Sequence, residues 1–380
     1  MRRIGWILIL GLTLTGCRPG SRGEPGFLRK DGSTYASYAR GFEVIEHEGY
    51  KVVQVHDPWQ NSRNVTFSYI LAGDVSRLPD SLRNHTTIQV PVSRVIALST
   101  THVAMIKQLD RTASIKGVSG PGYIYDPLIR EQISRGEITD VGYDQGLNLE
   151  NIVALEPDVL FIYGVENSMS GISDKLDEMG VPVVYCGEYL ENHPLGKAEW
   201  IRFFALFYGL EQEADRLFQQ VDSSYRSMAD AVRGKSSRPR VLTGLPWKGT
   251  WYMAGGNSFA ARFIEDAGGD FLWKENPSDE ALPLDLESVF VRAMEADVWI
   301  NPGEAKSLEQ LCEFDTRFRE LPVLKSGEVY NNDFRLGPDG GNDYWESGTV
   351  RPDLVLADLI AVFHPDLLTD HRYIYYRKLK

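Results

Sequence analysis

The 380-residue sequence is poor in the residues and patterns that build metal or nucleotide sites. Its cysteines are only Cys17, Cys186 and Cys312, and no Cys-x-x-Cys or His-Glu-x-x-His spacing occurs. No metal site is therefore predicted from ligand spacing, and no cofactor is expected. The Gly-x-x-x-x-Gly-Lys-Ser/Thr pattern that cradles nucleotide phosphates is also absent. These absences argue against a nucleotide-driven enzyme.

Positive charge is in short supply. The 40 Lys and Arg residues stand against 53 Asp and Glu residues, which gives a net charge of −13. Nucleic acids and anionic membrane surfaces attract basic proteins, so neither is an expected partner. The net charge does not describe any single pocket, which can still be basic.

The apolar run at residues 4–14 is shorter than the roughly 20 residues that a membrane-spanning helix needs. It follows Arg2 and Arg3 and precedes Gly16 and Cys17, as in a lipoprotein signal peptide. We expect residues 1–16 to be removed and Cys17 to carry acyl chains that anchor the protein in a membrane, facing the periplasm. A transmembrane helix and an ordinary secretory signal are the alternatives.

The two remaining cysteines, Cys186 and Cys312, lie far apart in the sequence. We expect two separate buried thiols, with a disulfide as the alternative that an oxidising compartment allows.

The chain changes character twice after the lipid site. Residues 17–40 have little apolar periodicity and predict a flexible tether. Residues 41–92 form an extension, in which β-rich runs at 41–47 and 50–55 around Glu48-Gly49 predict a β-hairpin, and residues 67–71 are a candidate third strand. From residue 93 strands and helices alternate, which indicates an α/β lobe with a mostly parallel sheet.

Residues 93–192 are expected to form that first lobe. Strands are predicted at 95–98, 114–118, 158–163 and 181–185, and helices at 100–109, 148–155 and 172–179. Residues 193–234 are predicted to form a long helical connector with one apolar face.

Residues 235–380 repeat the first lobe in outline. Strands are predicted at 240–244, 251–254 and 297–300, with helices at 258–267 and 286–290. The run Asn148-Leu149-Glu150 before one strand matches Asp285-Leu286-Glu287 before another. The sequence therefore predicts two duplicated lobes with an acid at the same place in each.

Six segments, taken in order, resemble the Fe/cobalamin-type periplasmic-binding domain. They are 94–98, 116–118, 146–150, 155–160, 176–183 and 286–287. The resemblance covers about residues 93–365 and leaves the hairpin outside. It implies two Rossmann-like lobes joined by a long rigid helix, the class III architecture, with the ligand between the lobes.

The resemblance also implies a function. Such proteins are monomers that capture a ferric siderophore, haem or corrinoid and deliver it to the membrane permease of an ABC importer. Glu150 and Glu287 match the glutamates, one per lobe, that dock onto permease arginines. Paired carboxylates suit a basic partner, whereas the structural alternative is a solvated glutamate in the first turn of each helix.

The ligand site is expected among aromatic and basic side chains in loops near strand ends. In the first lobe the candidates are Tyr123, Tyr125 and Tyr163. In the second lobe and its last loop they are Trp247, Trp251, Tyr252, Arg335, Tyr344, Trp345 and Arg351. For each aromatic the alternative is a place in the core, and for each cation, Lys248 included, a place on the surface.

Three questions stay open at this point. An iron chelate or haem is the expected ligand, and a corrinoid is the alternative. His102 is a candidate haem ligand, although a helix-capping or core histidine is more common. A metallocofactor enzyme or chelatase on a similar fold, and a scaffold lipoprotein whose hairpin binds a partner, are the competing classes.

Overall fold

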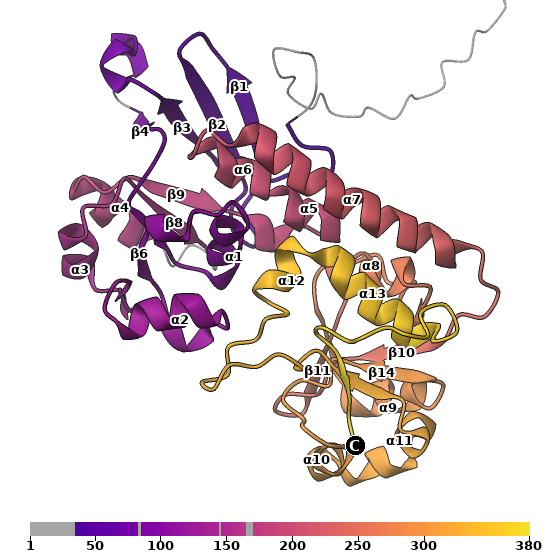
Figure 1. Ribbon diagram of the computed structural model, residues 1–380. Coiled ribbons are helices and arrows are strands. Elements are labelled where there is room, and N and C mark those ends of the chain that lie inside the picture. The colour runs from indigo at the N-terminus through magenta and orange to yellow at the C-terminus, as the bar shows by residue number, and fades with distance from the viewer. Residues whose placement is uncertain (1–34, 83–84, 144–145, 165–169) are drawn as a thin grey trace, which may run out of the picture.

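The computed structural model describes residues 35–82, 85–143, 146–164 and 170–380, and consists of two α/β lobes and an N-terminal sheet (Figure 1). The predicted signal peptide and Cys17 lie outside these residues. None of the described helices combines the length and the apolar character that crossing a membrane would require.

The N-terminal extension is a four-stranded sheet, which contains the predicted hairpin, the candidate third strand and a fourth strand that was not predicted. Its strands β1 (Phe42–Glu46), β2 (Tyr50–His56), β3 (Thr66–Ala72) and β4 (Thr86–Gln89) lie in that order. Neighbours are antiparallel except β3 and β4, which are parallel. Val44, Val53 and Tyr69 bury one face of the sheet, and the Tyr69 hydroxyl accepts a hydrogen bond from the Tyr185 N–H at 2.9 Å. The extension is thereby packed against the first lobe.

The first lobe has a parallel sheet of order β7-β6-β5-β8-β9. The strands are β5 (Val95–Ala97), β6 (Ile115–Val118), β7 (Thr139–Asp140), β8 (Val159–Tyr163) and β9 (Val183–Cys186). The helices are α1 (Thr100–Gln108), α2 (Pro127–Ser134), α3 (Leu149–Ala154) and α4 (Ser170–Glu178). The apolar run of β8 is buried up to its last residue, as in a strand covered on both faces.

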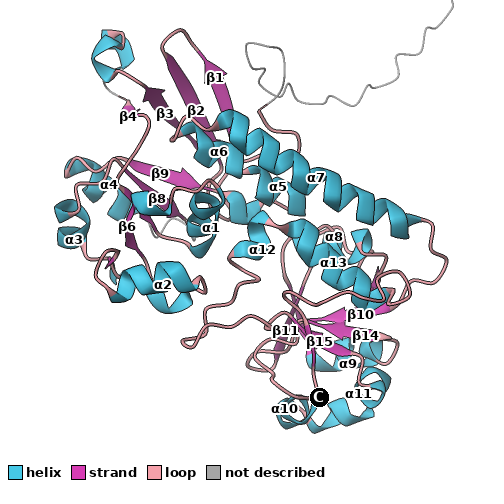
Figure 2. Ribbon diagram, in the orientation of Figure 1, coloured by secondary structure: helices cyan, strands magenta, loops and turns pink. Residues whose placement is uncertain are grey.

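The predicted connector at residues 193–234 folds as three helices rather than one. They are α5 (Pro194–Glu199), α6 (Ile201–Leu206) and α7 (Glu211–Arg233). Buried Trp200, Phe203 and Phe204 fix α6 in the core. In α7, Ala214 and Phe218 begin a buried stripe at helical spacing, and α7 packs against α6 and against α13 (Pro352–Phe363). Figure 2 shows α7 running alongside both lobes.

The second lobe has a sheet of order β12-β10-β14-β15-β16, in which only β16 is antiparallel to its neighbour. The strands are β10 (Arg240–Thr243), β12 (Asp270–Phe271), β14 (Val298–Ile300), β15 (Val329–Asn331) and β16 (Arg377–Lys378). A separate two-stranded antiparallel sheet consists of β11 (Thr250–Met253) and β13 (Leu282–Asp285). The further helices are α8 (Phe259–Asp266), α9 (Leu286–Ala293), α10 (Leu308–Phe314), α11 (Pro322–Ser326) and α12 (Ser347–Val350). The predicted α/β fold with two parallel sheets is confirmed.

Candidate functional site

A cavity of about 240 Å³ lies where loops of the first lobe meet the loop before α12. The first-lobe loops follow β5, β6, β7 and β8, so the cavity sits at the carboxyl ends of parallel strands, where open α/β sheets bind ligands. Its lining is Leu98, Ser99, Thr100, Ser119, Tyr123, Tyr143, Tyr163, Gly340, Asn342 and Trp345. We call it the aromatic cavity. Three tyrosines and a tryptophan give it flat apolar walls with polar edges.

A second cavity of about 320 Å³ adjoins the first, since Thr100 and Trp345 line both. The rest of its lining is Thr101, Glu188, Tyr189, Lys197, Phe259, Phe263, Tyr344, Gly348, Thr349 and Val355. We call it the inner cavity. Burial lowers the pKa of Lys197 to about 8, although the nearby carboxylates of Glu188 and Glu191 oppose that change.

Backbone contacts join the two lobes beside the aromatic cavity. The Glu346 carboxylate accepts hydrogen bonds from the N–H groups of Tyr125 at 2.7 Å and Asp126 at 3.1 Å. A Cβ at Gly341 would lie 2.7 Å from the Tyr123 carbonyl oxygen, so only glycine allows this close approach. Burial, with the charges of Asp343 and Asp126, raises the pKa of Glu346 to about 7 against the pull of the two N–H donors. Glu346 thus holds a carboxylate that titrates near neutral pH at the contact between the lobes.

Local backbone geometry places the tyrosines of the aromatic cavity. Gly120 has φ +55°, and a Cβ there would lie 2.8 Å from the Tyr123 ring and 3.0 Å from the Tyr143 ring. The two rings lie 5.2 Å apart between centroids. Tyr123 is 57% exposed and Tyr143 is 49% exposed, so each offers a free ring face to the cavity.

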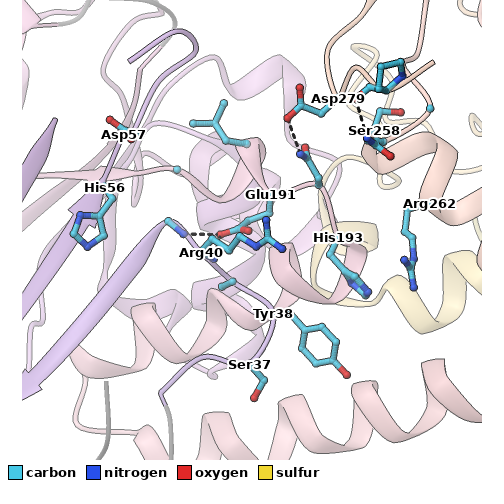
Figure 3. Close-up of a pocket in the computed structure, with 18 of the residues that line it drawn as sticks. Ser37, Tyr38, Arg40, His56, Asp57, Glu191, His193, Ser258, Arg262 and Asp279 are labelled. Atoms are coloured by element: carbon cyan, nitrogen blue, oxygen red, sulfur yellow. Dashed lines mark hydrogen bonds between the residues drawn. The ribbon is translucent and has the colours of Figure 1, made fainter. Parts of the chain in front are cut away.

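A larger, polar cavity of about 990 Å³ lies between residues 37–41, residues 187–193 and the start of α8 (Figure 3). Several of its polar groups bind one another. Glu191 accepts hydrogen bonds from the N–H groups of Arg40 and Gly41, at 2.8 and 2.9 Å, and Asn192 donates to Asp279 across the cavity at 3.0 Å. The hydrogen bonds from Arg40 and Gly41 to Glu191 hold the N-terminal segment in place, and this cavity is therefore a weaker candidate for the ligand site.

Comparisons with known proteins agree with this architecture. A sequence-family model described as "Periplasmic binding protein" matches residues 95–336. An uncharacterized lipoprotein of Methanocaldococcus jannaschii, MJ0878, is 30% identical over 293 residues, which are 74% of this chain and 68% of that protein. The chain belongs to the periplasmic binding protein family. This is a family of binding proteins and not of enzymes.

Other relatives are more distant. The molybdate-binding protein MolA of Haemophilus influenzae is 26% identical over 220 residues, covering 50% of this chain and 59% of that protein. A periplasmic heme-binding protein, RhuT from Roseiflexus, superposes with a TM-score of 0.56 at 20% identity, covering 72% of this chain and 98% of the other. The periplasmic vitamin B12-binding protein BtuF of Vibrio cholerae gives 0.50 at 14% identity, covering 74% and 99%. The two structures share the fold with this chain.

The structure brings together four of the ten predicted ligand-binding residues. Tyr123, Tyr163 and Trp345 line the aromatic cavity, and Tyr344 joins Trp345 in the inner cavity. The rings of Tyr344 and Trp345 lie 4.7 Å apart, edge to face. Tyr125 takes part through its backbone N–H to Glu346 and does not line either cavity.

The structure places Trp251, a candidate ligand-binding residue, in the core of the second lobe. It is 1% exposed, packs at 5.9 Å between ring centroids against Trp299, and donates its indole N–H to the Thr243 carbonyl at 3.1 Å. Because β11 alternates its side chains, Trp251 points into the core while its neighbour Tyr252 is exposed. Trp247 and Tyr252 lie on the surface and line neither cavity.

The predicted cations also lie outside the two cavities. Arg335 pairs with Asp343 at 2.9 Å and Arg351 pairs with Asp353 at 2.8 Å. Lys248 lies over the Trp247 ring, 4.3 Å from its centroid. Each of these three cations already contacts a carboxylate or an aromatic ring of the protein, so its position does not require a ligand.

Sequence reasoning missed Tyr143, Ser99 and Ser119. Ser119 directly follows β6 and Ser99 lies two residues after β5, so the strand-end rule that selected Tyr123 also selects them. Tyr143 follows β7, whose two residues are too short to form a visible strand pattern. His102 is 0% exposed, which agrees with the core alternative for this residue. The prediction of two separate buried thiols is confirmed, since Cys186 and Cys312 are both free and buried.

The two acids predicted for docking occupy matching positions. Asn148 caps α3 and Asp285 caps α9, each through its side chain to an N–H three residues on. Glu150 and Glu287 are the second residues of these helices, and both are exposed. Glu287 also lies 3.3 Å from the Arg317 guanidinium.

Proposed function

We propose that this protein is the solute-binding lipoprotein of an ABC importer, and that it holds its solute between the two lobes. The observation that carries the proposal is the aromatic cavity. It lies at the strand carboxyl ends of the first lobe and is closed by Trp345 from the loop before α12. Ligand sites in α/β proteins favour this position.

The solute that suits these walls best is a large metal complex with conjugated faces, either an iron chelate or haem. Flat apolar faces with hydroxyl edges complement a conjugated ligand. Among the described residues no Lys or Arg lines the aromatic cavity, and Lys197 is the one Lys or Arg that lines the inner cavity. A small oxyanion would need more positive charge. A corrinoid is the alternative of the same class.

The aromatic cavity is small for a ligand of this size. The aromatic cavity is smaller than the roughly 300–1,000 Å³ of typical ligand pockets. Trp345 separates it from the inner cavity and is 55% exposed, so its indole is little restrained by packing. A ligand that displaces this indole would occupy both cavities.

Delivery would use the exposed acids. Glu150 and Glu287 lie one on each lobe, so a permease with two basic sites can recognise their separation and hence the arrangement of the lobes. The α5–α7 segment would serve as a rigid connector that limits lobe motion. Acyl chains on Cys17 would anchor the protein in a membrane, facing the periplasm, and a monomer suffices for this role.

A ligand panel tests the function. Haem, cobalamin, ferric siderophores of catecholate and hydroxamate type, and molybdate are titrated into the purified protein, and tryptophan fluorescence is followed. We expect one of these large metal complexes, a ferric siderophore, haem or cobalamin, to quench the fluorescence saturably at 1:1 stoichiometry. Binding of molybdate alone would contradict the proposed solute class, and binding of none would contradict the function.

A further inference from the structure

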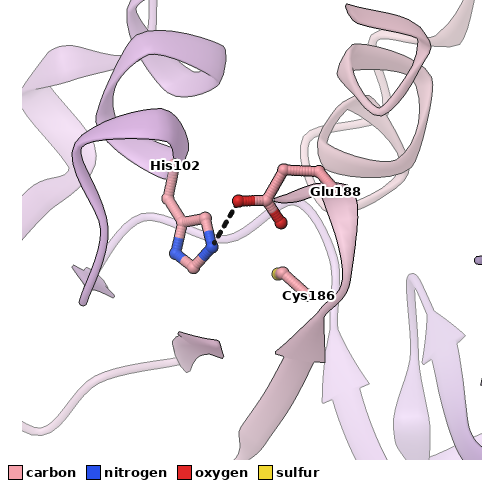
Figure 4. A group of neighbouring side chains, drawn as sticks. All are labelled: His102, Cys186 and Glu188. Atoms are coloured by element: carbon pink, nitrogen blue, oxygen red, sulfur yellow. Dashed lines mark ion pairs between the residues drawn. The ribbon is translucent and has the colours of Figure 1, made fainter. Parts of the chain in front are cut away.

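Three potential metal ligands, from α1 and from the end of β9, meet in the interior of the first lobe (Figure 4). His102 comes from α1, Cys186 ends β9, and Glu188 lies just beyond that strand. One potential ligand atom from each side chain lies within 4.8 Å of the others. All three residues are buried, with exposures of 0%, 0% and 1%.

The polar atoms of this group lack the hydrogen bonds that burial normally demands. Neither ring nitrogen of His102 has a hydrogen-bond partner, and Oε2 of Glu188 has none. The contact from Nε2 of His102 to Oε1 of Glu188 is 3.5 Å, which is an ion-pair distance without hydrogen-bond geometry. An unpartnered buried polar atom costs about 1–3 kcal/mol. An unpartnered ring nitrogen of His102 and the unpartnered Oε2 of Glu188, with the Cys186 sulfur beside them, indicate a missing partner.

We propose that His102, Cys186 and Glu188 bind a divalent transition-metal ion, with zinc as the ion that fits best. Imidazole nitrogen, thiolate sulfur and carboxylate oxygen are the three donor types that Zn²⁺ accepts, and a water completes a tetrahedral site. A thiolate and a carboxylate together neutralise the charge of the ion. The closed site would thus be free of net charge, which suits its burial.

A hydrogen bond also orients the Glu188 carboxylate toward the proposed ion. The Thr101 hydroxyl donates to Oε1 of Glu188 at 2.6 Å, which leaves Oε2 available to the ion. Cys186 would bind the ion as a thiolate, so binding must release the thiol proton to solvent.

The proposed site adjoins the inner cavity. Glu188 and Thr101 line that cavity, so the carboxylate side of the site is the side nearest to solvent-accessible space. Lys197 lines the same cavity, but its ammonium donates to the Tyr189 carbonyl at 2.7 Å and lies 4.4 Å from the Phe259 ring centroid. The site joins α1 to the end of β9 within one lobe, so it does not depend on the proposed transport role.

Cobalt titration tests this site, because a cobalt–thiolate bond has its own absorption band. The full-length chain is purified in detergent, stripped of metal and titrated with Co²⁺, and Zn²⁺ is then added as competitor. We expect one equivalent of Co²⁺, a thiolate-to-cobalt charge-transfer band, and loss of that band with one equivalent of Zn²⁺. Zn²⁺ should also raise the Tm.

Cys186→Ser is the test variant and Cys312→Ser the control, since Cys312 is the other buried free thiol. Cys186→Ser should fold, lose the charge-transfer band and bind Zn²⁺ about tenfold or more weakly, whereas Cys312→Ser should behave as the parent protein. Glu188→Gln should keep the band with weakened affinity. A folded parent protein that binds no cobalt would overturn the proposal and leave a buried ion pair of His102 and Glu188. A band that survives in Cys186→Ser would place the metal elsewhere and overturn it equally.

Discussion

The two lobes carry the same helix–strand unit, α3–β8 in the first and α9–β14 in the second. Each helix begins at a side-chain cap, and each strand begins next to an aspartate that holds the neighbouring strand. Asp158 accepts hydrogen bonds from the N–H groups of Ser93 and Arg94 at 2.6 and 2.9 Å, and Asp297 accepts one from Arg240 at 2.8 Å. The repeated sequence thus produces repeated local structure.

The units differ in what surrounds their acids. Glu287 lies 3.3 Å from Arg317, which is itself held by Asp315 at 2.7 Å. Glu150 has no ion pair within the described part of the chain. Local sequence therefore sets the position of each acid, whereas a residue 30 positions away sets how available the second acid is. The predictions below test this comparison.

The largest effect is expected when both acids are removed. Glu150→Ala combined with Glu287→Ala should abolish solute uptake and permease binding, because each lobe loses its docking carboxylate. Solute affinity should stay within about twofold, since neither residue lines a cavity. Uptake by cells and solute titration of the purified variant measure the two effects. A large loss of affinity in the folded variant would move these acids into the binding site.

A neighbouring pair in the second lobe separates core from surface. Trp251→Ala should lower the free energy of unfolding by about 3–5 kcal/mol, because it leaves a cavity beside Trp299 and an unpaired Thr243 carbonyl. Tyr252→Ala is the matched control and should change it by less than about 0.5 kcal/mol. Denaturant unfolding measures both. Equal stabilities would mean that the Trp251 ring is not part of the core.

Glu346 should make the stability of the lobe contact depend on pH. Its pKa is about 7 in the folded protein against 4.5 for the ordinary group, so the folded state binds this proton more tightly than the unfolded state. The stabilisation by the proton is complete below about pH 4.5 and is lost as pH rises through about 7. We expect the parent protein to lose about 3 kcal/mol over this range relative to Glu346→Gln, since each pKa unit corresponds to about 1.4 kcal/mol. Parallel pH profiles for both proteins would contradict the assignment.

The smallest effect sharpens the difference between the two acids. Arg317→Ala should free Glu287 and strengthen permease binding by about fivefold or less, because an exposed ion pair contributes about 1 kcal/mol at most. Surface plasmon resonance against the reconstituted permease measures this change. Weaker binding by Arg317→Ala would show that Arg317 itself contacts the permease.

Much of the fold could be predicted from the sequence because parallel strands leave continuous apolar runs, such as β8, and capped helices leave polar residues before apolar ones. The fourth strand of the N-terminal sheet could not be predicted. β4 pairs with β3 across a connection of 13 residues, from 73 to 85, and its own four residues show little alternation of apolar and polar side chains. The connector was also hard to divide. Trp200 and Phe207–Leu210 continue the apolar pattern of α5 and α6 while their backbone departs from a single helix.

A residue of the candidate site could be predicted only where its position in the sequence, at a strand end or in a glycine-rich loop, already indicated its surroundings. Tyr123, Tyr163 and Trp345 follow from their positions at strand ends and in a glycine-rich loop. The direction of a side chain did not follow, and Trp251 and Tyr252 differ only in which face of β11 they occupy. No sequence spacing predicts that His102 lies beside Cys186 and Glu188. His102 is more than 80 positions from the other two residues, and the order of the strands in the sheet brings α1 and the end of β9 together.

The central claim is that the solute binds in the aromatic cavity between the lobes. The most direct test measures the affinity of Tyr163→Ala and Trp345→Ala for the solute identified from the panel, with the exposed, distant Phe314→Ala as control. The account predicts that both variants melt like the parent protein and bind about 5- to 150-fold more weakly, since a buried aromatic contact contributes about 1–3 kcal/mol. Phe314→Ala should bind normally. Parent-like affinity in both folded cavity variants would contradict the account.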